Sequence, residues 1–180
     1  MVMTAPRADN RAFDDRAIDA RAVLVALDGV PDPEIPAVSI VELGMIGEVE
    51  VDAGGIRVEL LPTFVGCPAL ELIRESVAAR LAGMAPRVEV EMSFAEPWTS
   101  DRITAQGRRR LRESGFAPPQ PSSGPGEGRL LLTIASLPSA SCPWCGSADT
   151  ALENPFGPTR CRAIFWCNRC RQPFEQFKAV

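Results

Sequence analysis

The sequence predicts an α+β protein, with helices on one face of a small sheet and a C-terminal four-cysteine zinc-ribbon module. Segments of helical and strand periodicity alternate over residues 11–116. Residues 117–128 are rich in proline, glycine and serine and lack apolar periodicity, which is typical of a flexible linker. Two Cys-x2-Cys pairs follow within residues 129–180. We therefore expect one main domain and a small metal-dependent module that are weakly coupled to each other.

The first predicted helix covers residues 11–28 and ends at Gly29. Its apolar residues recur three or four positions apart: Phe13, Ala17, Ala20, Val23, Leu24 and Leu27. Residues 31–36 contain three prolines, which lack N–H donors and disfavour both helix and central strand. They form a stiff loop that carries the carboxylates of Asp32 and Glu34. The simplest interpretation of this pair is an ordinary solvated turn.

The middle of the chain predicts a hairpin, a helix and a third strand. Residues 47–51 and 56–60 alternate apolar and polar side chains around the turn residues 52–55. Residues 69–82 have apolar side chains at helical spacing, and residues 88–92 alternate again. This order is typical of an α+β sandwich with helices on one sheet face.

Two further elements are expected. A basic helix begins at Ser100 or Asp101, either of which can cap it, and runs to about Ser114. The apolar run at residues 130–134 either adds a strand to the C-terminal module or docks it on the body.

Cys67 lies where an apolar run ends at Gly66 and a helical pattern begins at Pro68. Proline suits a first helical turn because its missing N–H would be unpaired there. Cys67 is then at or beside the N-cap, where free N–H groups favour the thiolate over the thiol. It is therefore a candidate nucleophile or metal ligand. The alternative is a packing role, because free cysteines are among the most buried residues.

The C-terminal module contains four paired cysteines: Cys142, Cys145, Cys167 and Cys170. Each pair can direct two sulfurs at one ion, so together they complete a tetrahedral shell. One structural zinc per chain is the expected occupant, with iron as the alternative, and a module this small needs the metal to fold. Cys161 is the spare cysteine, which is either packed or a competing ligand.

Composition restricts the class of function. The net charge is −4, and the chain before residue 141 carries 14 basic and 20 acidic side chains, which disfavours nucleic-acid binding. No apolar run approaches the roughly 20 residues of a membrane span, and the first ten residues lack the apolar core of a secretory signal. We therefore expect a cytoplasmic protein whose six cysteines stay reduced. Histidine is absent, which excludes a Cys-His catalytic pair and a histidine-containing zinc site.

Three motifs in order resemble the SufT-like iron–sulfur cluster assembly domain family. They are DPEIP at 32–36, VELGMI at 41–46 and PTFVGCP at 62–68. With segments 94–119 and 142–178, the whole chain resembles a family of accessory proteins of the multicomponent phenylacetyl-CoA epoxidase, which acts in aerobic phenylacetate degradation. The resemblance places the functional thiol of the family on Cys67.

The same resemblance implies a maturation factor that assists assembly of an iron or iron–sulfur centre and is not itself an enzyme. It places the acidic loop of the family on Asp32 and Glu34. It also implies oxygenase or reductase components as partners, with iron or an iron–sulfur cluster carried transiently. The oligomeric state stays open, a homodimer included.

Two other interpretations stay open. A structural adaptor would hold the oxygenase components together with Cys67 buried. A thiol enzyme is disfavoured, because the chain lacks a histidine base and has no second cysteine near Cys67 in sequence. Thiol labelling of the native protein separates maturation factor from adaptor, since a buried cysteine stays unlabelled.

Overall fold

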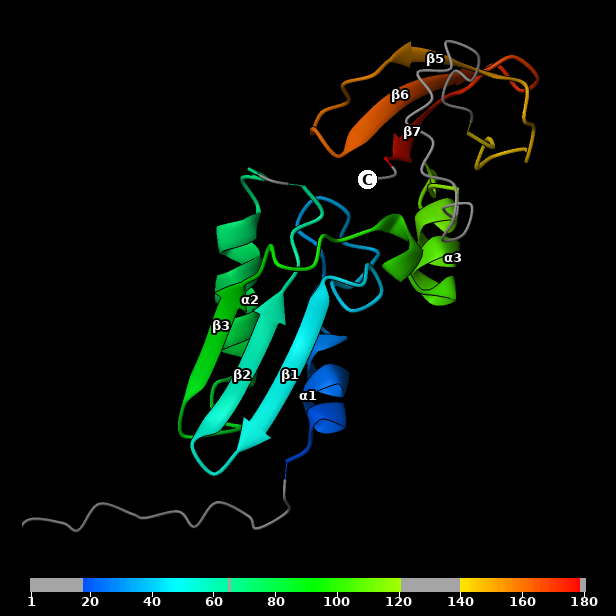
Figure 1. Cartoon of the computed structure of the whole chain (residues 1–180). Coiled ribbons are helices and arrows are strands. Elements are labelled where there is room, and N and C mark those ends of the chain that lie inside the picture. Colours follow the sequence, from blue (N-terminus) through cyan, green and yellow to red (C-terminus); the bar gives the residue numbers. More distant parts are fainter. Residues whose placement is uncertain (1–17, 65, 121–139, 179–180) are drawn as a thin grey trace, which may run out of the picture.

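The computed structural model describes residues 18–64, 66–120 and 140–178. The body of the molecule is built on a three-stranded sheet, and a second sheet lies at one end of it (Figure 1). The body sheet contains β1 (Ile46–Asp52), β2 (Gly55–Leu60) and β3 (Val88–Met92), in the order β1-β2-β3. β1 and β2 are antiparallel, whereas β2 and β3 are parallel. The predicted hairpin and third strand are confirmed.

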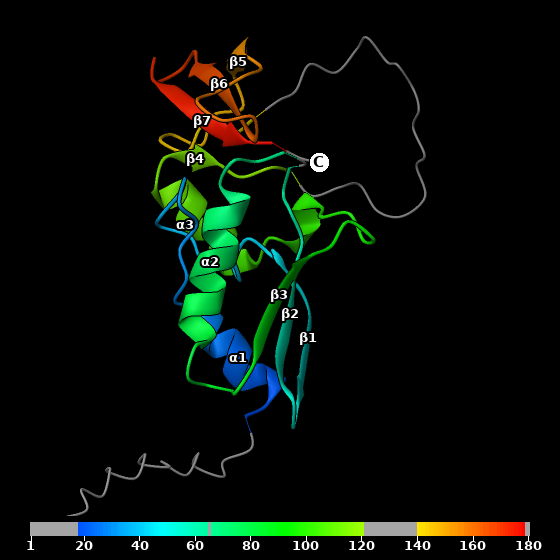
Figure 2. The ribbon, with the colours of Figure 1, turned by 90° about the vertical axis from the view of Figure 1, so that its left-hand side faces the viewer.

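Two helices cover one face of this sheet. Figure 2 shows α1 (Ala20–Leu27) and α2 (Leu70–Leu81) on the same side of the strands. Both contribute their buried apolar residues to the core that the strands also line. Arg80 Nε donates a hydrogen bond to the carbonyl of Ala26 at 2.8 Å, which ties α2 to α1. The α+β class with helices on one sheet face is therefore confirmed. None of the helices in the described ranges is long and apolar enough to cross a membrane.

The first two helices begin later than their apolar patterns predict. Asp19 is the N-cap of α1 and accepts the N–H of Ala22 at 2.7 Å, so the helix begins at Ala20. Residues 11–17 of the predicted helix lie outside the described residues. The N-cap of α2 is Ala69, one residue beyond the expected start at Pro68.

The basic helix α3 (Ala105–Glu113) also begins later than expected. Thr104 caps it by accepting the N–H of Gly107 at 2.9 Å, whereas Ser100 starts a single 3-10 turn, Ser100–Arg102. Arg110 Nη1 lies 3.1 Å from Glu42 Oε2, whose side chain is 6% exposed. This partly buried ion pair attaches α3 to the body.

The second sheet has the order β4-β7-β6-β5. Its strands are β4 (Phe116–Ala117), β5 (Thr150–Asn154), β6 (Arg162–Cys167) and β7 (Pro173–Phe177). β4 pairs in parallel with β7, so the first residue assigned to the linker belongs to a strand. Residues 121–139, which include residues 121–128 of the predicted linker and the apolar run at 130–134, lie outside the described residues.

The second sheet and the loops of residues 140–178 are together called the ribbon. The ribbon packs directly against the body. Phe177 of β7 is 3% exposed and belongs to the core of the body. Cys161 and Arg162 contact the loop that carries Glu34. This close contact differs from the weak coupling that the linker composition predicts.

Candidate functional site

Four cysteine sulfurs converge in the ribbon. The Sγ atoms of Cys142, Cys145, Cys167 and Cys170 all lie within 4.8 Å of one another. Two distances between the Cys-x2-Cys pairs, Cys142 to Cys170 and Cys145 to Cys167, are 3.6 Å. A tetrahedral zinc ion with Zn–S bonds of about 2.3 Å holds its sulfurs about 3.8 Å apart. The donor set therefore fits a tetrahedral ion and supports zinc binding.

The backbone of each pair explains this convergence. The carbonyl of Cys142 accepts the N–H of Gly146, and that of Cys167 accepts the N–H of Arg171, each at 2.9 Å. The residue that follows each pair has positive φ, 72° at Gly146 and 56° at Arg171. The N–H of Cys170 donates to the sulfur of Cys167 and lowers the pKa of that thiol to about 7. The turn thus stabilises a thiolate, the form that binds metal.

The acidic loop is held by one of its own carboxylates. Asp32 Oδ1 accepts the N–H groups of Glu34 and Ile35 at 2.9 and 2.8 Å. Ile35 is 2% exposed and anchors the loop in the core. Burial raises the pKa of Asp32 more than these two hydrogen bonds lower it, and the charge of Glu34 raises it further. Asp32 is therefore more than a solvated turn residue.

Cys67 lies two residues before the N-cap of α2, half-buried against the core of the body. The pKa of its thiol is raised, chiefly by burial. The N–H of Ala69 donates to the sulfur and opposes this, while the charges of Glu34 and Asp32 add to it. The N–H groups at the helix N-terminus do favour the thiolate, as the sequence predicts, but burial and two carboxylates outweigh them, so the net pKa of the thiol is raised.

The three candidate residues of the body lie within electrostatic range of one another. Asp32 and Glu34 are close enough to act electrostatically on Cys67, as the family resemblance implied. Their donor atoms converge less closely than the ribbon sulfurs, which form the one group of three or more such donors within 4.8 Å of one another among the described residues. The arrangement is thus open rather than a closed ligand shell.

Two ribbon residues that the sequence did not assign to this site reach Glu34. Cys161 Sγ donates a hydrogen bond to Glu34 Oε2 at 3.3 Å. Arg162 Nη2 donates to the carbonyl of Glu34 at 3.3 Å and lies 3.9 Å from Oε2. Burial raises the pKa of the Cys161 thiol to about 11. Cys161 is therefore packed against the acidic loop and is not part of the four-sulfur group.

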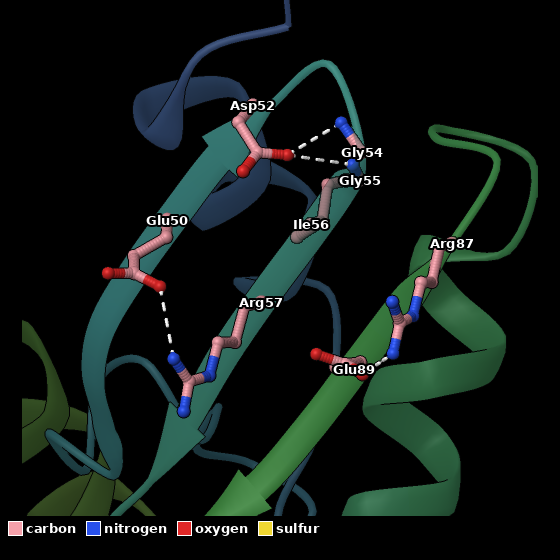
Figure 3. A pocket seen from close by; sticks show the side chains of 8 residues that line it. All are labelled: Glu50, Asp52, Gly54, Gly55, Ile56, Arg57, Arg87 and Glu89. Atoms are coloured by element: carbon pink, nitrogen blue, oxygen red, sulfur yellow. Dashed lines mark hydrogen bonds and ion pairs between the residues drawn. The ribbon is translucent and has the colours of Figure 1, made fainter.

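A charged pocket lies on the face of the body sheet that the helices leave open (Figure 3). Arg57 pairs with Glu50 at 3.3 Å, and Arg87 pairs with Glu89. Asp52 Oδ1 accepts two N–H groups of the hairpin turn at 2.7 and 3.0 Å. Because these charges already have partners, we assign the pocket a structural role.

Comparisons with known proteins divide the chain into the same two parts, the body and the ribbon. Residues 20–92 match a family model described as iron–sulfur cluster assembly protein, and residues 132–178 match the PaaD zinc beta ribbon domain. The chain thus joins an iron–sulfur-assembly-type domain to a zinc ribbon. It is 38% identical over 159 residues to an Escherichia coli (strain K12) protein provisionally assigned as one of the subunits of 1,2-phenylacetyl-CoA epoxidase, and the match covers 86% of this chain and 89% of that protein. The chain belongs to the same family as this protein, the PaaD family.

Two solved structures resemble part of the chain, each at 26% identity. A domain of unknown function, DUF59, from Bacillus anthracis has a TM-score of 0.48 and matches 51% of this chain and 89% of its own. A conserved hypothetical protein from Thermotoga maritima has a TM-score of 0.47 and matches 54% of this chain and 98% of its own.

Proposed function

We propose that this protein is an accessory maturation factor of the multicomponent phenylacetyl-CoA epoxidase in aerobic phenylacetate degradation. It assists assembly of an iron or iron–sulfur centre through Cys67 and is not itself an enzyme. Membership of the PaaD family and the match to an iron–sulfur cluster assembly model support this proposal. The observation that carries it is that the carboxylates of Asp32 and Glu34 lie within electrostatic range of the Cys67 thiol, whose pKa both charges raise.

The chemistry of these three side chains suits ferrous iron as a transient cargo. One thiolate and two carboxylates offer sulfur and oxygen donors, and their open arrangement leaves positions for ligands from a client protein. A donor of metal must also release it, so an open shell is an advantage. Because the pKa of Cys67 is raised, iron binding displaces the thiol proton and is stronger at higher pH.

The ribbon has a different role in this proposal. Cys142, Cys145, Cys167 and Cys170 hold one structural zinc, because four sulfurs close a tetrahedral shell and leave no catalytic position. The zinc supplies folding free energy that so small a module lacks. The folded ribbon then contacts the oxygenase or reductase components of the epoxidase.

A second candidate function is a structural adaptor that holds the epoxidase components together. The observation that favours it is the half-buried, protonated thiol of Cys67, which packs against the core of the body. In that case Cys67 fills space and carries no metal.

Replacement of Cys67 distinguishes the two functions. Under the maturation proposal, Cys67→Ala leaves the fold and the ribbon zinc intact, but the epoxidase accumulates poor in iron or iron–sulfur cluster and the cells grow slowly on phenylacetate. Cys67→Ser is nearly as deficient, because a serine hydroxyl stays protonated at neutral pH. Growth on an unrelated carbon source serves as the control. Normal growth on phenylacetate with a fully metallated epoxidase establishes the adaptor function instead.

A further inference from the structure

The side chain of Glu34 is held from the ribbon. Its carboxylate accepts the hydrogen bond of Cys161 at 3.3 Å, and its carbonyl accepts that of Arg162 at 3.3 Å. Glu34 is only 17% exposed at its side chain, so these contacts replace water around a charged group. The ribbon therefore determines where this carboxylate lies.

Arg162 is itself firmly anchored. Its side chain is 10% exposed, and its Nη1 lies 2.9 Å from Glu175 Oε2. Its Nε donates to Thr159 Oγ1 at 3.0 Å, and its guanidinium lies 5.3 Å from the ring centroid of Phe116. A planar guanidinium with partners on several sides has little freedom to move. Arg162 can thus fix the loop that carries Glu34.

We propose that Cys161 and Arg162 are positioning residues of the candidate iron site, which hold the loop and the carboxylate of Glu34 in place. The inference rests on the proposed function for its metal, and it makes ribbon and body two halves of one site. Groups that hydrogen-bond a metal-binding side chain set its orientation, and their loss commonly weakens metal binding 10- to 100-fold. The ribbon is then required for iron loading as well as for contact with a partner.

This arrangement also connects the two metal sites through one strand. β6 begins with Arg162 and ends with Cys167, one of the four converging cysteines. Zinc that fixes the end of the strand at Cys167 also helps to fix its beginning at Arg162. Zinc in the ribbon therefore favours iron binding at the candidate site.

Cobalt binding to the zinc-loaded, full-length protein tests the inference. Co2+ serves as the probe for Fe2+, because it binds similar donors and does not displace the more tightly held zinc. The readouts are the thiolate-to-cobalt absorption band and the dissociation constant. Cys161→Ala and Arg162→Lys are expected to weaken binding about 10-fold or more. Cys161→Ser keeps a hydrogen-bond donor and is expected to bind as the unchanged protein does, as is the control Arg160→Lys, at an exposed neighbouring arginine.

Each outcome bears on the inference. Unchanged affinity in Cys161→Ala and Arg162→Lys overturns the positioning role and leaves the proposed function standing. Loss of affinity in Cys161→Ser as large as in Cys161→Ala also overturns it, because Cys161 is then a ligand. Should Arg162→Lys fail to fold, the Cys161 pair decides alone.

A metal-independent measurement separates this inference from the proposed function. If the unchanged protein shows no thiolate-to-cobalt band, the iron function fails. Hydrogen exchange at the amides of Glu34 and Ile35, which donate to Asp32, still reports on the loop. Faster exchange in Cys161→Ala but not in Cys161→Ser supports positioning by the ribbon, and equal exchange overturns it.

Discussion

The indole ring of Trp98 meets the ring of Phe177 edge-on, with centroids 5.9 Å apart and an interplanar angle of 72°. Trp98 belongs to the body, where its Nε1–H donates to the carbonyl of Leu43 at 2.9 Å. Phe177 ends the last strand of the ribbon. Both side chains are buried, so this aromatic pair fastens the ribbon to the body.

We expect Phe177→Ala to lower the free energy of unfolding by about 3–5 kcal/mol, because it leaves a cavity in a core that both modules share. Denaturant unfolding followed by tryptophan fluorescence measures this loss. The matched control is Phe94→Ala, since Phe94 is 58% exposed. Its expected effect is within about 0.5 kcal/mol. Equal losses in the two variants would show that Phe177 does not join the modules.

The ribbon sulfurs lead to a prediction about metal content. Cys142→Ser is expected to lose the zinc, because three remaining sulfurs cannot close the tetrahedral shell. Cys161→Ser is the matched control and keeps one zinc per chain, since Cys161 lies outside the four-sulfur group. Elemental analysis of the purified proteins measures both. Zinc retained in Cys142→Ser, or lost in Cys161→Ser, contradicts the ligand assignment.

Local patterns were sufficient to predict the three strands of the body sheet and the metal-binding module. Alternation at residues 47–51 and 56–60 reflects one buried sheet face, and that face exists in the structure. The four-sulfur group follows from the spacing within each Cys-x2-Cys pair, because both sulfurs of a pair are set by one short turn. These features depend on neighbours in sequence.

Features that depend on burial were not predictable in this way. Ser100 and Thr104 both have the hydroxyl that an N-cap needs, but Ser100 is fully buried, with no partner for its Oγ among the described residues, and only Thr104 caps α3. At Cys67, the helix N–H groups were visible in sequence, whereas the burial that outweighs them was not. The contact from Cys161 to Glu34 spans 127 positions, and no periodicity signals it.

A close approach of two backbones gives another prediction. Gly44 has a φ of 68°, and a Cβ atom there would lie 2.4 Å from the carbonyl oxygen of Arg102. Gly83 has a similar φ of 88° but open space around it. Both alanine variants are destabilised because an alanine is then held at positive φ. We expect Gly44→Ala to lower the free energy of unfolding by about 1–3 kcal/mol more than Gly83→Ala does, because only at position 44 is the added Cβ atom overpacked. Equal unfolding free energies would contradict the close approach.

The raised pKa of Cys67 predicts how its reactivity changes with pH. Only the thiolate is alkylated readily, so in a zinc-loaded Cys161→Ser background the rate at Cys67 is low at neutral pH. The alkylation rate increases with pH, and the midpoint of this increase lies at a higher pH than the midpoint for the unfolded chain. The folded protein holds this proton more tightly than the unfolded chain does. The contribution of Cys67 to the free energy of unfolding is therefore complete below the pKa of this thiol in the unfolded chain, and it is lost as the pH rises through the pKa in the folded protein.

Replacement of a neighbouring charge tests the cause of this shift. The carboxylate of Glu34 raises the pKa of Cys67, so Glu34→Gln is expected to move the midpoint of the alkylation profile to lower pH. Burial, the larger cause, is unchanged, so the midpoint stays above that of the unfolded chain. Glu153→Gln, at an exposed position of the ribbon, is the matched control and leaves the profile unchanged. A midpoint in the unchanged folded protein below that of the unfolded chain would mean that the helix N–H groups prevail and that Cys67 is a thiolate at neutral pH.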